Sequence, residues 1–107
     1  MAYEVRLQPL AENDLDEAYL WAAKRAPETS AIWLARFQAA LTTLVENPDR
    51  CGFAPENRKF DKGLRQLLFG RKPNVFRVVF LIDPGIVRIV RIRRAARRPL
   101  KPGDLGE

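Results

Sequence analysis

The chain has 107 residues, a formal net charge of +6, one cysteine and no histidine. This length favours one compact domain spanning residues 1–107, with residues 101–107 as a frayed, flexible tail. The lone Cys51 excludes an internal disulfide, and the lack of histidine excludes a Cys-His zinc site, so we expect no metal and no cofactor. No stretch has the length and apolarity of a signal peptide or a membrane span, which predicts a cytoplasmic protein without a membrane partner.

The basic residues are segregated along the chain. Residues 1–57 contain five basic and nine acidic side chains, whereas residues 58–101 contain fourteen basic side chains against only Asp61 and Asp83. Such a distribution creates a local positive field that attracts phosphate backbones or an acidic protein partner. The alternative is a solvated basic face that serves solubility, but solubility rarely needs so one-sided a pattern.

The first half of the chain predicts a strand followed by two helices. Apolar and polar side chains alternate over residues 3–7, which indicates a short half-buried strand. Apolar or small residues then recur at helical spacing over residues 13–26, with Asn13 or Asp14 available as the N-terminal cap. A second helix is expected over about residues 29–47, and the short turn between the helices makes them an antiparallel hairpin.

The second half predicts a meander of three antiparallel strands. An irregular connector at residues 48–63 contains two prolines and two glycines, after which period-two alternation returns at residues 64–69, 75–83 and 86–93. The last two strands are joined by a tight turn at Asp83-Pro-Gly85. With the first strand they form a roughly four-stranded sheet of the α+β class, whose helices cover one face.

Alternation within these strands predicts which arginines share a face. Alternate positions from Phe76 to Ile82 are uniformly apolar and should face the helices, which places Arg77 on the opposite, uncovered face. We expect Arg65 on the same open face. In the last strand both parities mix arginine with apolar residues, which favours a central strand with a bulge or twist and leaves its faces unassigned.

The open face is the candidate surface for binding a nucleic acid or a protein target. Guanidinium groups bind phosphate in a bidentate way, but their very high pKa makes them poor general acids or bases. Any one of these residues taken alone could be an ordinary surface arginine. The candidate binding residues are Arg65, Arg77, Arg91, Arg93, Arg94, Arg97 and Arg98.

Several motifs occur in a characteristic order along the chain. They are the Asn47-Pro48 helix stop with Arg50-Cys-Gly52, the strand entry Gly63-Leu-Arg65, the strand Phe76-Arg77-Val-Val-Phe80, and Arg91-Ile-Arg-Arg-Ala-Ala-Arg97. Together with the order of elements, they resemble the RelE/ParE superfamily of bacterial toxin-antitoxin toxins. The resemblance spans the chain from Tyr3 to about Leu100. It implies a plasmid-stabilisation type of toxin, held inactive by a cognate antitoxin, that either cleaves mRNA on the ribosome or inhibits DNA gyrase.

The resemblance to the nuclease branch is incomplete. Its cationic positions match Arg65, Arg77 and Arg97, which are the candidate catalytic residues if the chain is a nuclease. A second basic position of that branch falls on Leu67, the histidine found in many relatives falls on Arg94, and no tyrosine follows Arg97. Cleavage through a ribose 2′-OH also needs groups that accept and donate protons. The remaining candidates for that role are Glu46, Asp61 and Lys62, which nothing in the sequence places near the arginines.

Three functions therefore remain open. A toxin that binds gyrase without catalysis is favoured by the incomplete proton-transfer set, and a ribosome-dependent mRNA endonuclease is favoured by the three arginines. A non-toxic nucleic-acid-binding module is the third, but an exposed aromatic stacking platform is missing from the pattern. A toxin that has lost its activity is a further possibility. For a toxin, we expect an acidic, partly disordered antitoxin segment to cover the open face, including Arg65 and Arg77.

Overall fold

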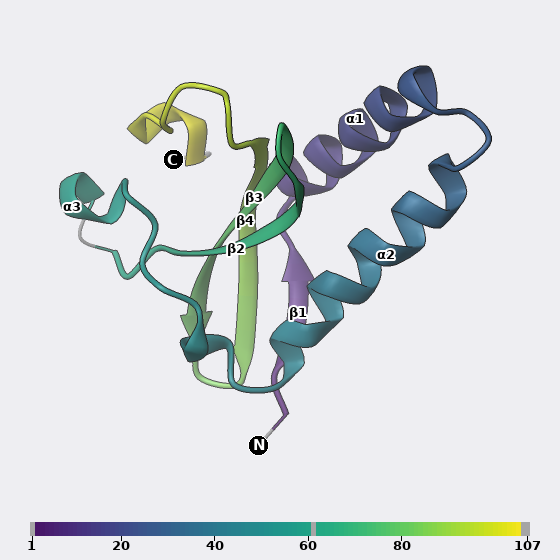
Figure 1. Cartoon of the computed structure of the whole chain (residues 1–107). Helices are drawn as coiled ribbons and strands as arrows, with labels where there is room; N and C mark the ends of the chain where they lie inside the picture. Colours follow the sequence, from purple (N-terminus) through teal and green to yellow (C-terminus); the bar gives the residue numbers. More distant parts are fainter. Residues whose placement is uncertain (1, 61, 106–107) are drawn as a thin grey trace.

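The computed structural model describes residues 2–60 and 62–105, and over these residues it contains one mixed four-stranded sheet with the order β1-β4-β3-β2. Strand β1 runs parallel to β4, whereas β3 is antiparallel to both β2 and β4. The α+β class and the three-strand meander predicted from alternation are confirmed (Figure 1). The strands are β1 (Glu4–Leu7), β2 (Arg65–Arg71), β3 (Asn74–Asp83) and β4 (Ile86–Arg94).

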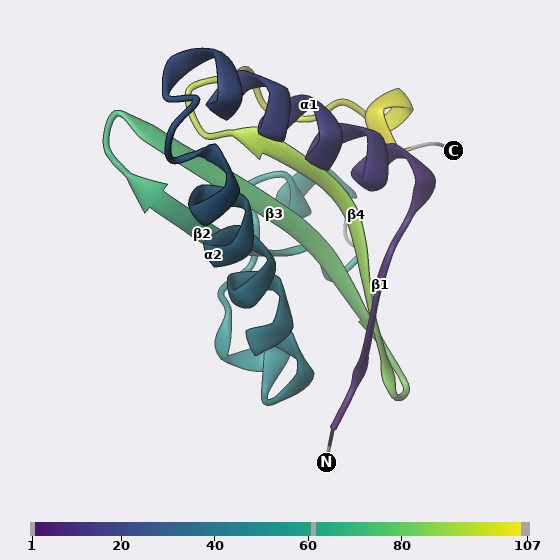
Figure 2. The same ribbon diagram turned by 90° about the vertical axis from the view of Figure 1, so that its right-hand side faces the viewer.

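Two long helices form a hairpin that covers one face of this sheet (Figures 1 and 2). They are α1 (Pro9–Arg25) and α2 (Ser30–Thr42), and α2 continues into the 3-10 turn η1 (Thr43–Val45). None of the helices in the described part of the chain is long and apolar enough to cross a membrane. Shorter elements follow: η2 (Pro48–Arg50), α3 (Asn57–Phe60) and η3 (Pro102–Leu105).

Helix α1 begins about one turn earlier than the sequence predicted. Its first residue is Pro9, whose fixed φ suits the first turn of a helix, and Gln8 is the N-cap. Neither Asn13 nor Asp14 is the cap. Asp14 is instead buried inside the helix–sheet interface, where its carboxylate accepts a hydrogen bond of 2.9 Å from the backbone N–H of Ile92.

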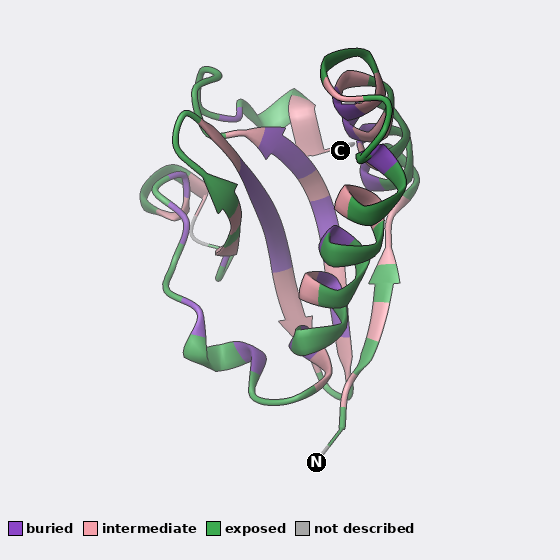
Figure 3. Ribbon diagram, turned by 45° about the vertical axis from the view of Figure 1, so that its right-hand side comes forward, coloured by how far each residue is buried: buried purple, intermediate pink, exposed green. Residues whose placement is uncertain are grey.

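The main hydrophobic core lies between the helical hairpin and the sheet (Figure 3). The alternate apolar positions of β3 face the helices, as predicted, with Phe76, Val78 and Phe80 almost completely buried. Phe76 packs edge-on against Trp21 with ring centroids 5.3 Å apart, and Phe37 from α2 lies 4.6 Å from Phe69 of β2. Burial of each such aromatic side chain contributes about 1.5–3 kcal/mol.

Strand β4 is central and carries the bulge that its mixed pattern predicted. Val79 pairs with Arg91 while the next β3 residue, Phe80, pairs with Ile89, so Val90 is the extra residue. The extra residue shifts the alternation by one position. As a result both Ile89 and Ile92 face the helices, although they have opposite parity in the sequence.

The face of the sheet away from the helices, called here the second face, is covered, which corrects the prediction of an open face. A second apolar cluster forms there from β3, β4, the connector and the C-terminal segment, and its buried members are Ala54, Leu64, Val79, Val90 and Leu100. Residues 102–105, expected within a frayed tail, form η3 and take part in this cover, while residues 106–107 lie outside the described residues. The physical reason is that Val79 and Val90 present apolar surface that the connector and Leu100 can bury.

Candidate functional site

Arg77 lies on the second face, as predicted, but its guanidinium is buried rather than free to bind a target. The residue is 8% exposed, and its Nη1 and Nη2 donate to the two carboxylate oxygens of Glu56 at 3.0 and 2.5 Å. Nη1 also donates to the side-chain oxygen of Gln66 at 2.8 Å. A guanidinium binds a phosphate through the same two parallel hydrogen bonds, so Glu56 occupies the donors of Arg77 that a phosphate would use.

Glu56 is the partner that the sequence interpretation missed. Only 4% of the residue is exposed, and its Oε2 also accepts the backbone N–H of Leu100 at 2.9 Å. Burial by itself would raise the pKa of Glu56, but the hydrogen bonds from Arg77 and Leu100 outweigh it and lower the pKa to about 2. A carboxylate held so firmly in its ionised form is a weak proton acceptor at neutral pH. Glu56 therefore ties the connector and the C-terminal segment to Arg77.

Arg65 lies on the opposite face of the sheet from Arg77, which corrects the prediction that they share one surface. It pairs directly with Phe80, and paired residues on neighbouring strands point to the same side. Its Nη1 donates to the carbonyl oxygens of Asp49 and Cys51 at 3.2 and 2.6 Å, and its guanidinium stacks over the exposed ring of Phe53 at 4.3 Å. Arg65 thus anchors the connector to the start of β2.

Arg91 and Arg93 are also engaged within the protein. Arg91 makes a bidentate ion pair with Asp14 of α1, through Nε at 2.7 Å and Nη2 at 2.9 Å. This hydrogen-bonded pair raises the pKa of Arg91. Arg93 is paired across the strands with Arg77 on the second face, is 5% exposed and forms an ion pair of 3.5 Å with Asp104.

The remaining arginines of the predicted set lie at the end of β4 and beyond it. Arg94 stacks over Trp21 at 4.9 Å on the helix side of the sheet. Arg97 is exposed and lines a small cavity of about 180 Å³ together with Asp14 and Trp21. The half-exposed side chain of Arg98 pairs with Asp104 at 3.1 Å. The predicted set is therefore divided between the two faces of the sheet and the segment after β4.

Of the three candidates for proton transfer, Glu46 and Lys62 lie among the described residues. Glu46 is exposed just after η1, where its backbone carbonyl accepts a hydrogen bond from Arg50. Lys62 is exposed, and Asp61 lies outside the described residues. Among the residues that the structure describes, no group of three or more histidine, cysteine or acidic side chains could hold a metal ion. The arginines of the predicted set offer positive charge and hydrogen-bond donors, which suit anionic groups, but their very high pKa makes them poor general acids or bases.

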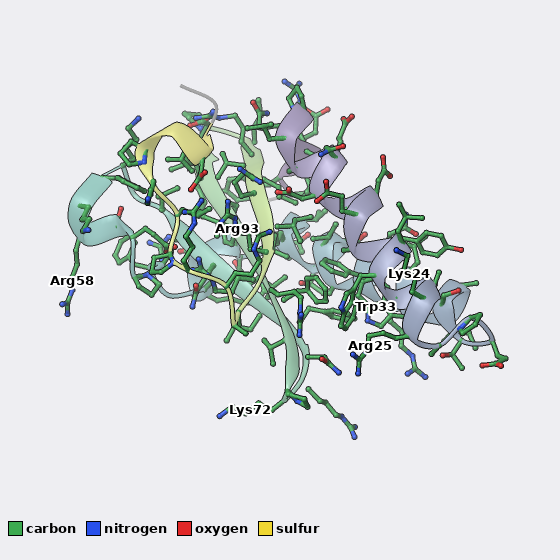
Figure 4. All side chains as sticks on the ribbon, turned by 90° about the horizontal axis from the view of Figure 1, so that it is seen from above. Lys24, Arg25, Trp33, Arg58, Lys72 and Arg93 are labelled. Atoms are coloured by element: carbon green, nitrogen blue, oxygen red, sulfur yellow. The ribbon has the colours of Figure 1, made fainter. Side chains whose placement is uncertain are left out.

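An open groove of about 680 Å³ lies between the tip of the helical hairpin and the β2–β3 turn. Its apolar surface comes from three aromatic rings and from Ile32, which is 55% exposed. Trp33 lies between the other two rings and packs against both Trp21 and Phe69. In Figure 4 the labelled side chains of Arg25 and Trp33, which both line this groove, lie close together beside the helical hairpin. Three exposed arginines and no acidic residue belong to its lining, the arginines being Arg25, Arg36 and Arg71.

Comparison with known proteins identifies the family. Residues 5–99 match the model of the ParE toxin of the type II toxin-antitoxin system parDE. The chain belongs to the ParE toxin family. The RelE/ParE resemblance inferred from the sequence motifs is thus confirmed, and membership of this family implies a cognate antitoxin as partner.

A solved structure of a ParE-like fold agrees with this assignment. It comes from the chromosomal ParDE toxin-antitoxin system of P. aeruginosa and superposes with a TM-score of 0.69, covering 87% of this chain and 96% of that chain. At 21% sequence identity this likeness shows the shared fold alone. A search of curated protein sequences found no match.

Proposed function

We propose that this ParE-family toxin belongs to a plasmid-stabilisation module and arrests growth by binding DNA gyrase, without cleaving RNA. The observation that supports this proposal is the bidentate pair between Arg77 and Glu56, because it occupies the guanidinium that a nuclease would need for phosphate. Arg65 lies on the other face of the sheet and Arg97 lies beyond β4, so the three matching arginines do not converge. A toxin that acts by binding needs no such convergence.

The proposed antitoxin site is the groove between the helical hairpin and the β2–β3 turn, in place of the open face expected from the sequence. Its aromatic floor offers apolar area for a few anchoring side chains, and Arg25, Arg36 and Arg71 surround that floor with positive charge. Charge complementarity selects an acidic segment with an apolar stripe, the type of segment that orders on binding. Arg25 and Arg94 both stack on Trp21, which keeps this ring positioned at the groove wall.

The target is tested by inducing the chain alone in a bacterial host, and by adding the purified chain to a gyrase supercoiling assay. The expected results are intact cellular mRNA, a DNA-damage response and inhibition of supercoiling. Codon-phased mRNA cleavage that disappears in Arg97→Ala would instead establish the endonuclease. Arg97 is exposed, so this variant tests the nuclease without disturbing the buried Arg77–Glu56 pair. Normal growth with active gyrase would support the binding module or a toxin that has lost its activity.

The antitoxin site is tested by intrinsic fluorescence. The chain has two tryptophans, Trp21 and Trp33, and both line the groove. Titration with the acidic segment of the cognate antitoxin should therefore shift the emission to shorter wavelength as water leaves the rings. Tight binding without any change in emission would place the antitoxin on another surface. This readout is independent of the gyrase assay.

A further inference from the structure

Asp104 in η3 lies at the centre of a cluster of arginines on the second face. Its Oδ1 is 3.5 Å from Nη2 of Arg93, and its Oδ2 accepts a hydrogen bond of 3.1 Å from Nη1 of Arg98. Its backbone carbonyl accepts a further hydrogen bond of 2.7 Å from Nη1 of Arg91. One short turn of the chain therefore engages a nitrogen of each of three guanidinium groups, which we call the Asp104 cluster.

The cluster holds more donors than Asp104 can satisfy. Nε and Nη1 of Arg93 are buried and have no hydrogen-bond partner among the described residues. The neighbouring carboxylate, Glu56, is already used by Arg77 and by the N–H of Leu100. Burial, together with the nearby charge of Arg91, lowers the pKa of Arg93. A buried donor without a protein partner is costly, and such groups in folded proteins are accounted for by a bound water or ion, by strain or by a functional role.

Only the end of the chain needs to move for the cluster to open. Leu100 is buried and its N–H is bonded to Glu56, which holds the preceding segment against the sheet. Residues 101–105 follow this anchor. Their turn accepts hydrogen bonds from Arg91 and Arg98, is closed by a hydrogen bond within itself, and packs Leu105 against the second apolar cluster. Figure 4 shows Arg93 on the side of the sheet where α3 and the C-terminal turn lie. Displacement of η3 would release Nη1 of Arg91 and Nη2 of Arg93, in addition to the two unpartnered nitrogens of Arg93, and would leave Nη1 of Arg98 with only the carbonyl oxygen of Pro99.

We propose that Arg91, Arg93 and Arg98 form a phosphate-binding site that Asp104 occupies in the isolated chain. A phosphate group fits these donors better than a second carboxylate does. A phosphate group presents more oxygens than a carboxylate, and they are arranged tetrahedrally. A second carboxylate in the place of Asp104 would have only two oxygens and would leave the same nitrogens of Arg93 unpaired. The phosphate comes either from a nucleic-acid backbone or from a free phosphate compound. The site is separate from the groove and depends on neither the antitoxin nor the gyrase proposal.

Asp104→Asn tests this inference because it removes the competing charge while its amide oxygen can still accept the N–H of Lys101, which now bonds Oδ2 at 2.8 Å. Titration calorimetry with pyrophosphate in about 0.15 M salt should show binding about tenfold tighter than to the unmodified chain. Asp16→Asn is the matched control, since it changes the net charge equally at an exposed position of α1. Equal tightening in both variants would mean a general charge effect and would overturn the proposal.

A second pair of variants protects the test against loss of folding. The side chain of Arg98 is 51% exposed, so Arg98→Gln should fold, and in the Asp104→Asn background it should weaken pyrophosphate binding by about tenfold. Arg6→Gln, exposed on β1, removes the same charge and should leave binding unchanged. Absence of pyrophosphate binding in Asp104→Asn, with a thermal unfolding profile like that of the parent, would also overturn the site.

Further titrations distinguish the two sources of phosphate. A short single-stranded oligonucleotide that binds Asp104→Asn more tightly than pyrophosphate, and loses this advantage in the Arg98→Gln background, would assign the site to a nucleic-acid backbone. Pyrophosphate binding without any gain from the oligonucleotide would assign it to a free phosphate compound. Each result supports a phosphate site, and neither requires the toxin to be active.

Discussion

The two faces of the sheet use the same residue type in opposite ways. On the helix side, Arg25, Arg36 and Arg71 are exposed around an apolar groove, where their charges are available to a partner. On the second face, Arg77 and Arg93 are buried beneath the connector and the C-terminal turn, and they pair with carboxylates of the same chain. The first set is suited to recognition, whereas Arg77 holds the cover of the sheet together.

The number of arginines in a segment therefore does not locate a binding surface. The most basic part of the sequence, residues 58–101, supplies Arg77 and Arg91, which are neutralised by carboxylates of the same chain. Two of the three groove arginines, Arg25 and Arg36, come from the helical hairpin, which belongs to the acidic half of the chain. An exposed guanidinium can attract a ligand, whereas a buried guanidinium needs a partner within the protein to offset its loss of hydration.

The largest expected effect comes from breaking the buried pair on the second face. Glu56→Ala leaves the guanidinium of Arg77 without its carboxylate, and loss of one partner of a buried ion pair typically costs about 3–5 kcal/mol. Urea unfolding should show this loss relative to the unmodified chain. Glu28→Ala, at an exposed position between the helices, should change the free energy of unfolding by less than about 0.5 kcal/mol. Similar stabilities of the two variants would contradict the role assigned to Glu56.

Acid should weaken the second face before the groove side. The pKa of Glu56 is lowered to about 2 in the folded chain, so its contribution is complete above the ordinary value near 4.5 and disappears as the pH falls toward 2. At most about 3 kcal/mol of stability should be lost over this interval. This loss is measured as the fall in the urea midpoint of the unmodified chain between pH 7 and pH 2.5. The stability of Glu56→Gln should fall less over the same range. Parallel curves for both chains would argue against an ionised Glu56.

Charge reversal around the groove should affect binding rather than folding. The triple variant Arg25→Glu, Arg36→Glu, Arg71→Glu should lower antitoxin affinity by about thirtyfold, or roughly 2 kcal/mol, because repulsion replaces attraction at the rim. Its stability should remain close to that of the parent, since these side chains are exposed. The control variant Arg6→Glu, Arg58→Glu, Lys59→Glu carries the same charge change away from the groove. Equal loss of affinity in both would show that only net charge matters.

The smallest effect is expected at Arg65, whose environment is intermediate between the two sets. Arg65→Leu removes hydrogen bonds to the carbonyl oxygens of Asp49 and Cys51 and the stacking on Phe53, at a cost of about 1 kcal/mol. Thermal unfolding measures this change. A loss as large as that of Glu56→Ala would mean that the connector depends on Arg65 more than on the Arg77–Glu56 pair.

Local patterns predicted most of the fold, and their failures occurred where distant residues meet. Alternation located β3 and the helix-facing side of Phe76, and the mixed parity of β4 predicted its bulge. The α1 start was placed too late because a proline at the first helical position resembles a strand terminator. Glu56 was missed because it precedes Arg77 by 21 residues in an irregular connector, where no periodicity marks a buried carboxylate.

The order and type of the main elements, the family resemblance and the segregation of charge could all be inferred from the amino-acid sequence, because each of these follows from short-range spacing or composition. Which arginines are available to a partner depends instead on contacts between distant parts of the folded chain. Arg77 and Arg91 are neutralised by Glu56 and Asp14, and Asp14 lies 77 residues from its partner along the chain. Such pairs depend on strand register, on one extra residue in β4 and on the path of a loop. These features arise from packing over the whole chain and leave no periodic trace in the sequence.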